Sequence, residues 1–155
     1  MNGKSLTGVI VAIVLAVGSF FAYQDYQFRK TYGAVTEVGL FNYDQEVEKV
    51  GDKPVLIYFY RQEEGVASDA EMDVTKSFAW WNAGKVKVVA INVAHLENLP
   101  LAIAHAALRQ PAFVFMHNGQ ELISAQGKFV SGDELNRLYE QLKNAKPAAQ
   151  QGLSK

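Results

Sequence analysis

The sequence contains no cysteine in its 155 residues. This absence excludes disulfide bonds, thiolate catalysis, cysteine-ligated zinc, iron–sulfur clusters and a lipid-modified cysteine. Neither sign of charge is in excess, since 15 basic and 16 acidic residues give a net charge of −1. Binding to nucleic acid usually requires a basic face, so we expect no nucleic-acid partner. The length allows one compact domain of ordinary size.

Charge is missing altogether from a long stretch near the N-terminus. Residues 5–24 carry no charged side chain, and their apolar part covers residues 6–23. A helix that crosses a bilayer needs about 20 such residues. Lys4 precedes the run, and Tyr23 and Tyr26 lie where an interfacial aromatic belt would be placed. The pattern predicts a single N-terminal membrane anchor within residues 1–30, with residues 6–23 in the membrane.

A cleaved signal peptide is the alternative interpretation of the same segment. Ala16-Val17-Gly18 resembles a cleavage site with small residues at alternate positions, and cleavage there would leave Ser19 as the new N-terminus. The apolar run continues past this point through Phe20, which favours retention of the segment.

The charges that flank the segment do not determine its orientation. Lys4 and the amino terminus on one side balance Arg29 and Lys30 on the other. Anchors with a short N-terminal tail commonly leave the C-terminal domain outside. We therefore expect a single-pass protein of the bacterial inner membrane with its C-terminal domain in the periplasm. Without residues 1–30 the chain has 12 basic and 15 acidic residues, a net charge of −3.

The remainder of the chain alternates between predicted strands and helices. Residues 55–60 are apolar without alternation, as in a strand buried on both faces. Asn118-Gly119 is typical of a hairpin turn, and Ser131 with Glu134 forms a capping-box pattern at the start of the last helix. The predicted strands cover residues 32–39, 55–60, 86–93, 112–116 and 122–125, and the predicted helices cover residues 44–50, 67–82, 99–108 and 132–145.

This order of elements determines the expected fold class. Crossover helices make the early strands parallel, and the hairpin makes the last strand antiparallel. The sequence therefore predicts a three-layer α/β/α sandwich with a mixed sheet.

The arrangement resembles the thioredoxin-like superfamily over residues 35–145, so we expect a thioredoxin-like domain at residues 31–145 and a flexible tail at residues 146–155. Residues 55–60 are similar to the strand that leads into the thioredoxin active site, and Gln110-Pro111 is similar to the cis-proline site before the hairpin. The resemblance would place a Cys-x-x-Cys pair at Glu64 and Ala67. Because neither residue is cysteine, disulfide exchange is excluded.

The resemblance also implies a site that needs no sulfur. In the family, the backbone beside the cis-proline pairs with an extended peptide, which is a form of β-strand addition. A proline retained for the fold alone is the alternative. The expected groove residues are Gln62, Glu63, Glu64, Gly65, Val66, Arg109, Gln110 and Pro111.

Other chemistry-bearing residues have an ordinary structural interpretation. Glu63 and Glu64 could act as a general acid and base, but carboxylates also favour the positive end of a helix dipole. The histidines His95, His105 and His117 have no metal-ligand spacing. We expect no metal, no cofactor and no enzymatic activity.

Trp80 and Trp81 are adjacent on a predicted helix, so their side chains point about 100° apart. Packing of both in the core is one interpretation. An exposed tryptophan that marks an interface is the other.

Together these features predict a redox-inactive thioredoxin-like module that binds protein partners at the membrane. An accessory or chaperone-like part of an envelope complex of secretion, conjugation or pilus type fits this description. Two alternatives remain, an enzyme that uses Glu63 and Glu64 or the histidines, and a secreted, processed holdase.

Overall fold

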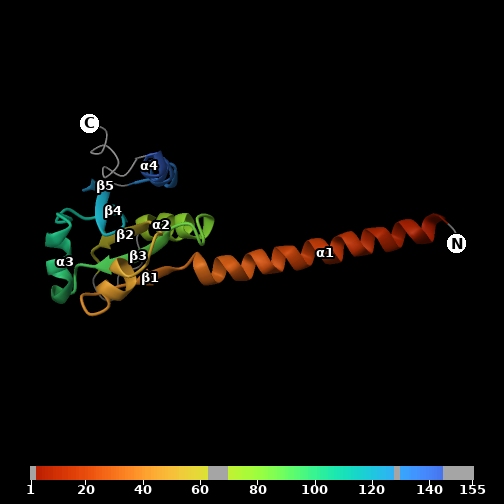
Figure 1. The fold of residues 1–155 in the computed structure, drawn as a ribbon, viewed down its shortest axis with the longest axis horizontal. Helices are drawn as coiled ribbons and strands as arrows, with labels where there is room; N and C mark the ends of the chain where they lie inside the picture. The colour runs from red at the N-terminus through yellow and green to blue at the C-terminus, as the bar shows by residue number, and fades with distance from the viewer. Residues whose placement is uncertain (1–2, 63–69, 128–129, 145–155) are drawn as a thin grey trace, which may run out of the picture.

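The computed structural model describes residues 3–62, 70–127 and 130–144. A long helix, α1 (Gly3–Tyr32), projects as a rod from an α/β domain (Figure 1). Its segment Gly8–Tyr32 is long and apolar enough to cross a membrane, and the most apolar window of this segment is not buried against the domain. The side chains of Val14, Leu15 and Phe21, for example, are more than half exposed.

One mixed sheet of five strands, in the order β1-β3-β2-β4-β5, forms the centre of the domain. β1 and β2 both run parallel to β3, whereas β4 is antiparallel to β2 and β5 is antiparallel to β4. These pairings confirm the mixed sheet that the crossover order predicts. The strands are β1 (Val35–Glu37), β2 (Val55–Tyr60), β3 (Lys87–Asn92), β4 (Ala112–His117) and β5 (Gln120–Gln126).

β2 lies at the middle of the sheet, with β3 on one side and β4 on the other. All six of its residues are 5% exposed or less, which confirms the prediction of a strand buried on both faces. Alternate side chains enter two different cores. Leu56 and Tyr58 belong to one core, and Ile57 and Phe59 belong to the other.

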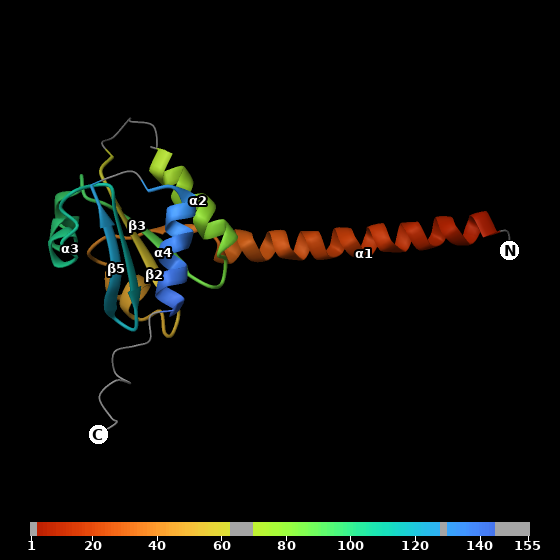
Figure 2. The same cartoon turned by 90° about the horizontal axis from the view of Figure 1, so that it is seen from above.

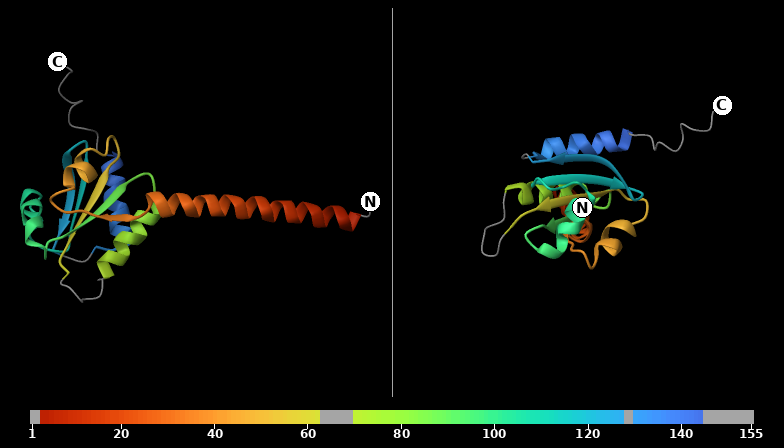
Figure 3. Two further views of the ribbon diagram at one scale, coloured as in Figure 1. Left: turned by 90° about the horizontal axis from the view of Figure 1, so that it is seen from below. Right: turned by 90° about the vertical axis from the view of Figure 1, so that its left-hand side faces the viewer.

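Helices cover the two faces of the sheet and complete a three-layer α/β/α sandwich. On one face, α2 (Ala70–Trp81) and α4 (Gly132–Asn144) pack over the core that contains Leu56. On the other face lie the π-helical turn η1 (Asp44–Glu48), the short 3₁₀ turn η2 (Leu96–Asn98) and α3 (Leu99–Ala104). Figures 2 and 3 show that the α2–α4 layer is on the side of the sheet toward α1, and α3 is on the far side.

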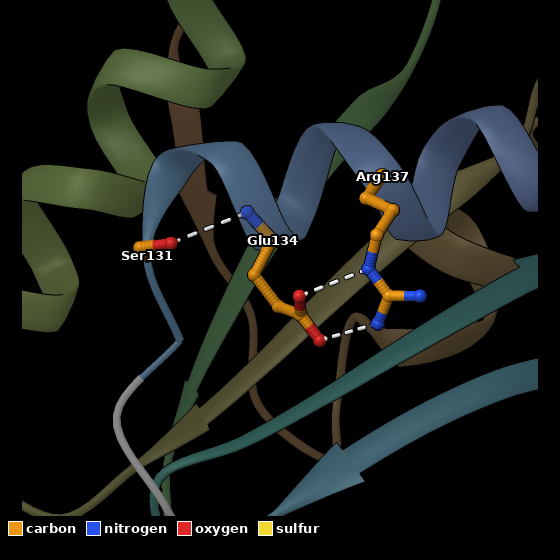
Figure 4. Close-up of polar contacts among 3 residues, drawn as sticks. All are labelled: Ser131, Glu134 and Arg137. Carbon is orange, nitrogen blue, oxygen red and sulfur yellow. Dashed lines mark hydrogen bonds and ion pairs between the residues drawn. The ribbon is translucent and has the colours of Figure 1, made fainter.

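The start of α4 has the predicted cap. Ser131 Oγ accepts a hydrogen bond of 3.2 Å from the backbone N–H of Glu134 (Figure 4). The Glu134 carboxylate forms a two-bonded ion pair with Arg137, one turn further along the helix. The serine half of the capping box is therefore present, and the glutamate contacts a cation on its own helix.

The hairpin between β4 and β5 also has the predicted turn. Asn118 and Gly119 adopt φ of 52° and 72°. Positive φ at both central residues is the geometry whose twist matches that of the flanking strands.

Three predicted elements are shorter than expected. The strand at residues 32–39 contains only β1, because α1 continues to Tyr32. The helix at 44–50 is the five-residue turn η1, closed by a hydrogen bond from Lys49 N–H to the Asp44 carbonyl oxygen. The helix at 99–108 ends at Ala104, because Ala106 turns the chain with a φ of 51° on the way to Pro111.

Candidate functional site

The loop after β2 is attached to the end of β3 by one side chain. Asn92 Nδ2 donates to the carbonyl oxygen of Gln62 at 2.8 Å, and Asn92 Oδ1 accepts from the Gln62 N–H at 3.1 Å. The amide therefore reproduces a two-bonded backbone pair beyond the end of the ladder. It determines the position of Gln62, the first residue of the expected groove.

A second asparagine connects this end of the sheet to two more segments. Asn98 is 5% exposed, and its Nδ2 donates to the Asn92 carbonyl oxygen at 2.9 Å. Its Oδ1 accepts from the Leu40 N–H at 3.0 Å. Neither asparagine is among the residues predicted from the sequence. The available signal was Asn92, a polar residue at the end of the apolar run that forms β3. An amide in such a position needs hydrogen-bond partners.

A cavity of about 230 Å³ lies on the α2 side of the predicted groove. Gln110 and Pro111 line it together with Arg61, Glu71 and two tyrosines of β2, Tyr58 and Tyr60. The Gln110–Pro111 peptide bond is cis. The structure thus places Gln110 and Pro111 beside the end of β2, in a cavity that also contains the Arg61 cation and the Glu71 carboxylate.

The backbone around Pro111 is held from both sides. The N–H of Gly127 donates to the carbonyl oxygens of Arg109 at 3.1 Å and Pro111 at 2.9 Å. The Gln110 side chain donates from Nε2 to the Ala107 carbonyl oxygen at 2.7 Å. Arg109 is exposed, so its guanidinium is accessible from solvent.

Four predicted groove residues, Glu63, Glu64, Gly65 and Val66, lie outside the described residues. The other four are described, and the structure separates them. Gln110 and Pro111 share the 230 Å³ cavity, whereas Gln62 lines a larger cavity beside it.

This larger cavity has a volume of about 730 Å³ and lies over the ends of β1, β3 and β2. Amide side chains of Asn42, Asn92 and Asn98 line it with the carboxylates of Glu37 and Glu97. Its described lining contains no lysine or arginine. Phe41 belongs to the lining, and its side chain is 93% exposed, which is unusual for a large aromatic residue.

Exposed apolar side chains follow one another on η2 and α3. Leu96, Leu99 and Ile103 are 81%, 38% and 59% exposed, and their spacing places them along one side of the helical segment. Leu108 is 59% exposed and precedes Arg109 and the two cavity-lining residues Gln110 and Pro111 in the chain. We call Leu96, Leu99, Ile103 and Leu108 the apolar stripe. Such a group of exposed apolar residues is typical of an interaction surface.

His105 is buried, at 9% exposure, in contrast to His95. Its Nε2 and the hydroxyl of Tyr43 form a hydrogen bond, and its Nδ1 lies 3.6 Å from a Glu121 carboxylate oxygen. Phe59 packs against the same ring. This cluster joins the residue before η1, the residue after α3, and the strands β2 and β5. Residues so far apart along the chain leave no common sequence pattern.

Burial of the Tyr43 hydroxyl, with the nearby carboxylates of Glu48 and Asp44, raises the pKa of this phenol well above its ordinary value. The hydroxyl therefore remains protonated when it contacts His105. His105 therefore has a structural role inside the domain. His117 has another partner, since its Nε2 bonds to the Asp52 carbonyl oxygen.

The two tryptophans lie at the end of α2, where α1 enters the domain. The rings of Trp80 and Tyr26 are 5.7 Å apart, and the Arg29 guanidinium carbon lies 5.1 Å from the centre of the Trp81 ring. Trp80 is half-buried, and Trp81 is 66% exposed. Both residues thus contact α1 rather than lie in either core.

The layers, the strand order and the position of Pro111 define a thioredoxin-like fold. Thioredoxin f from spinach chloroplast is similar over 77% of this chain and 92% of its own, with 21% identity and a TM-score of 0.58. A mutant thioredoxin from Halobacterium salinarum NRC-1 is similar over 75% of this chain and 96% of its own, with 22% identity and a TM-score of 0.58. No protein-family model and no curated protein sequence matches the chain.

The fold therefore agrees with the resemblance that the sequence suggested. Since the chain has no cysteine, it cannot carry out the dithiol exchange that the thioredoxin Cys-x-x-Cys motif supports.

Proposed function

We propose that this protein is a redox-inactive thioredoxin-like module that binds a protein partner at the surface of a membrane. Its partner belongs to a bacterial envelope complex of secretion, conjugation or pilus type, in which this chain is an accessory or chaperone-like component. The observation that carries the proposal is the presence of two features in neighbouring segments of the chain. The apolar stripe is exposed on η2, α3 and Leu108, and the chain then continues through Arg109 to Gln110 and Pro111, which line the 230 Å³ cavity.

The chemistry of this surface supports a protein ligand over a small molecule. Leu96 and Ile103 are exposed apolar side chains. Covering them with a partner stabilises the complex by about 25 cal/mol per Å² of apolar area removed from water. Arg61 and Arg109 are exposed at the same end of the domain and can pair with carboxylates of the partner. An extended partner segment beside Pro111 would use backbone hydrogen bonds for affinity.

The position of the surface supports the tether. α1 is the membrane anchor in this proposal, and the C-terminal domain lies in the periplasm of a bacterial inner-membrane protein. The apolar stripe is on the α3 layer, which Figure 3 shows on the far side of the sheet from α1. A domain held in this way presents the stripe away from the membrane, toward a partner in the envelope.

Site-specific photocrosslinking in native membranes tests the proposal. A photoreactive amino acid at Arg109 should give one crosslinked adduct whose partner, identified by mass spectrometry, is an envelope protein. The same amino acid at Glu140, exposed on α4, is the matched control and should give no such adduct. The variant Pro111→Ala, read out from Arg109, should reduce the adduct several-fold. Equal labelling from Arg109 and Glu140 would contradict the proposal.

Two measurements test the tether itself. A C-terminal tag should be accessible to protease added to spheroplasts and protected in intact cells. Mass spectrometry of the mature chain should find the N-terminal segment retained. A mature N-terminus at Ser19 would instead support the processed, secreted form.

A further inference from the structure

The C-terminal end of α2 is attached to the end of α1 by three kinds of contact. Arg29 donates from Nη1 to the Trp80 carbonyl oxygen at 3.2 Å, and its Nε pairs with Asp25 at 2.7 Å. Its guanidinium lies over the face of the Trp81 ring, and the Tyr26 ring packs on Trp80. Figure 2 shows the end of α2 meeting α1 where α1 leaves the domain.

Close packing determines the position of this junction. A Cβ at Gly33 would lie 2.7 Å from the Arg29 carbonyl oxygen and 3.0 Å from Trp80 Cα, both of which are backbone atoms. A Cβ at Gly84 would lie 2.7 Å from the Phe28 ring. The backbone of the domain therefore approaches α1 as closely as glycine allows, so Trp81 has a defined height along the helix axis.

That height corresponds to the boundary of a bilayer. The uncharged segment of α1 ends at Gln24, and the apolar run ends at Tyr23. Tyr26 is about 4.5 Å and Arg29 about 9 Å beyond Tyr23 along the axis, at 1.5 Å per residue. The headgroup layer on each side of the hydrocarbon core is about 5–8 Å thick. Tyr26 thus lies within this layer, and the backbone of Arg29 lies just beyond it, with its Nε directed back toward Asp25 on the preceding turn.

The side chains at this height suit the headgroup layer. Trp81 is 66% exposed, although its indole ring is one of the largest apolar surfaces in the chain. Tryptophan and tyrosine are enriched at the membrane interface because the ring is apolar and its polar atom can still bond to water or headgroups. On α1, Tyr23 and Tyr26 are 62% and 51% exposed. The Arg29 guanidinium, which pairs with Asp25 one turn nearer the apolar run, adds a cation at the edge of this layer.

We infer that the tip of α2, with Trp81 at its end, rests in the phospholipid headgroup layer of the membrane that α1 enters. The domain then has two attachments to the membrane, α1 and Trp81, which together hold it in one orientation. The inference rests on the membrane anchor of the proposed function. It adds a second lipid contact, made by the end of α2. This segment is far from the anchor in the sequence, since Trp80 follows Arg29 by 51 residues.

The chain contains its own probe, because Trp80 and Trp81 are its only two tryptophans. The full-length protein is reconstituted into phosphatidylcholine–phosphatidylglycerol vesicles that contain nitroxide-labelled lipids. Trp80→Phe leaves Trp81 as the sole emitter, and Trp81→Phe leaves Trp80 as the matched control. Headgroup-labelled lipid should quench Trp81 about twofold more than lipid labelled deep in the acyl chain, and it should quench Trp80 less than Trp81.

Other outcomes distinguish the inference from the anchor on which it rests. If alkaline carbonate extracts the protein from the vesicles, the anchor is wrong and the lipid contact is wrong with it. If the protein resists extraction while aqueous acrylamide quenches Trp81 fully and no labelled lipid does, the anchor stands and the Trp81 contact is overturned. Strongest quenching by the deep label would also overturn it, since Trp81 would then lie within the hydrocarbon.

Discussion

Arg29 on α1 donates a hydrogen bond to the backbone carbonyl oxygen of Trp80, 51 residues further along the chain. The last carbonyl groups of a helix have no partner within it, and the negative end of the helix dipole favours a cation there. One side chain from α1 therefore caps α2. The same side chain connects α1 to the folded domain.

Replacement of Arg29 by Met retains the aliphatic part of the side chain but removes every donor. We expect the domain to lose about 1 kcal/mol of stability, because a charge-assisted hydrogen bond and a favourable dipole interaction disappear. Urea denaturation of the full-length protein in detergent measures the loss. Lys30→Met removes the same charge from the exposed neighbouring position, so an equal loss there would contradict a specific role for Arg29.

Gly33→Ala should destabilise the junction by about 1–3 kcal/mol, the usual cost of overpacking. The new methyl group would meet the backbone of Arg29, Trp80 and Ala79 within 3.1 Å, and backbone atoms have little freedom to move away. Gly132→Ala is the matched control, because its Cβ has nothing within 4 Å. Thermal denaturation of both variants should separate them, and equal midpoints would contradict the close approach.

Removal of the α4 cap by Ser131→Ala should lower stability by about 1 kcal/mol. The alanine cannot accept the hydrogen bond from the Glu134 N–H that Figure 4 shows. Ser131→Asp restores an acceptor at the positive end of the helix and should recover most of the loss. A denaturation midpoint for Ser131→Asp as low as that of Ser131→Ala would argue against the cap.

The stability of the domain should fall with rising pH once the medium passes the ordinary tyrosine pKa of about 10. The folded state raises the pKa of Tyr43, so above that pH the unfolded chain releases a proton that the folded domain retains. The contribution is fully present below pH about 10 and is lost at higher pH. Tyr43→Phe has no such proton, and its stability should fall less steeply. Parallel slopes for the two proteins would contradict the shift.

Polar replacement of the apolar stripe should affect binding and not folding. Ile103→Ser changes a side chain that is 59% exposed, so the free energy of unfolding should change by no more than about 0.5 kcal/mol. The adduct formed from Arg109 in membranes should decrease several-fold. Leu122→Ser, at 40% exposure on β5 and outside the stripe, is the control and should leave the adduct unchanged.

Much of the fold was accessible from local sequence patterns. The unbroken apolar run at residues 55–60 predicted a strand buried on both faces, because only a central strand needs apolar residues at successive positions. Asn118-Gly119 predicted a turn and Ser131 predicted a helix cap, because the residues that form each of these features lie within a few positions of one another. The absence of cysteine excluded thiol redox chemistry on composition alone.

The candidate site was only partly accessible in this way. The similarity of Gln110-Pro111 to the cis-proline site pointed to the right end of the sheet, where the structure places Arg61 and Glu71 beside it. Asn92 and Asn98 were not predicted because their partners, Gln62 and Leu40, are 30 and 58 residues away. Side-chain amides have no periodicity that would indicate such partners.

The sequence by itself determined the fold class, the apolar N-terminal helix and the loss of thiol chemistry, because each depends on composition or on residues close together in the chain. Only the tertiary structure decided that Trp80 and Trp81 contact α1, that His105 is buried against Tyr43, and that Asn98 joins three segments. Each of these contacts joins segments that come together only when the sheet is complete. Their energies therefore depend on the whole fold rather than on any local pattern.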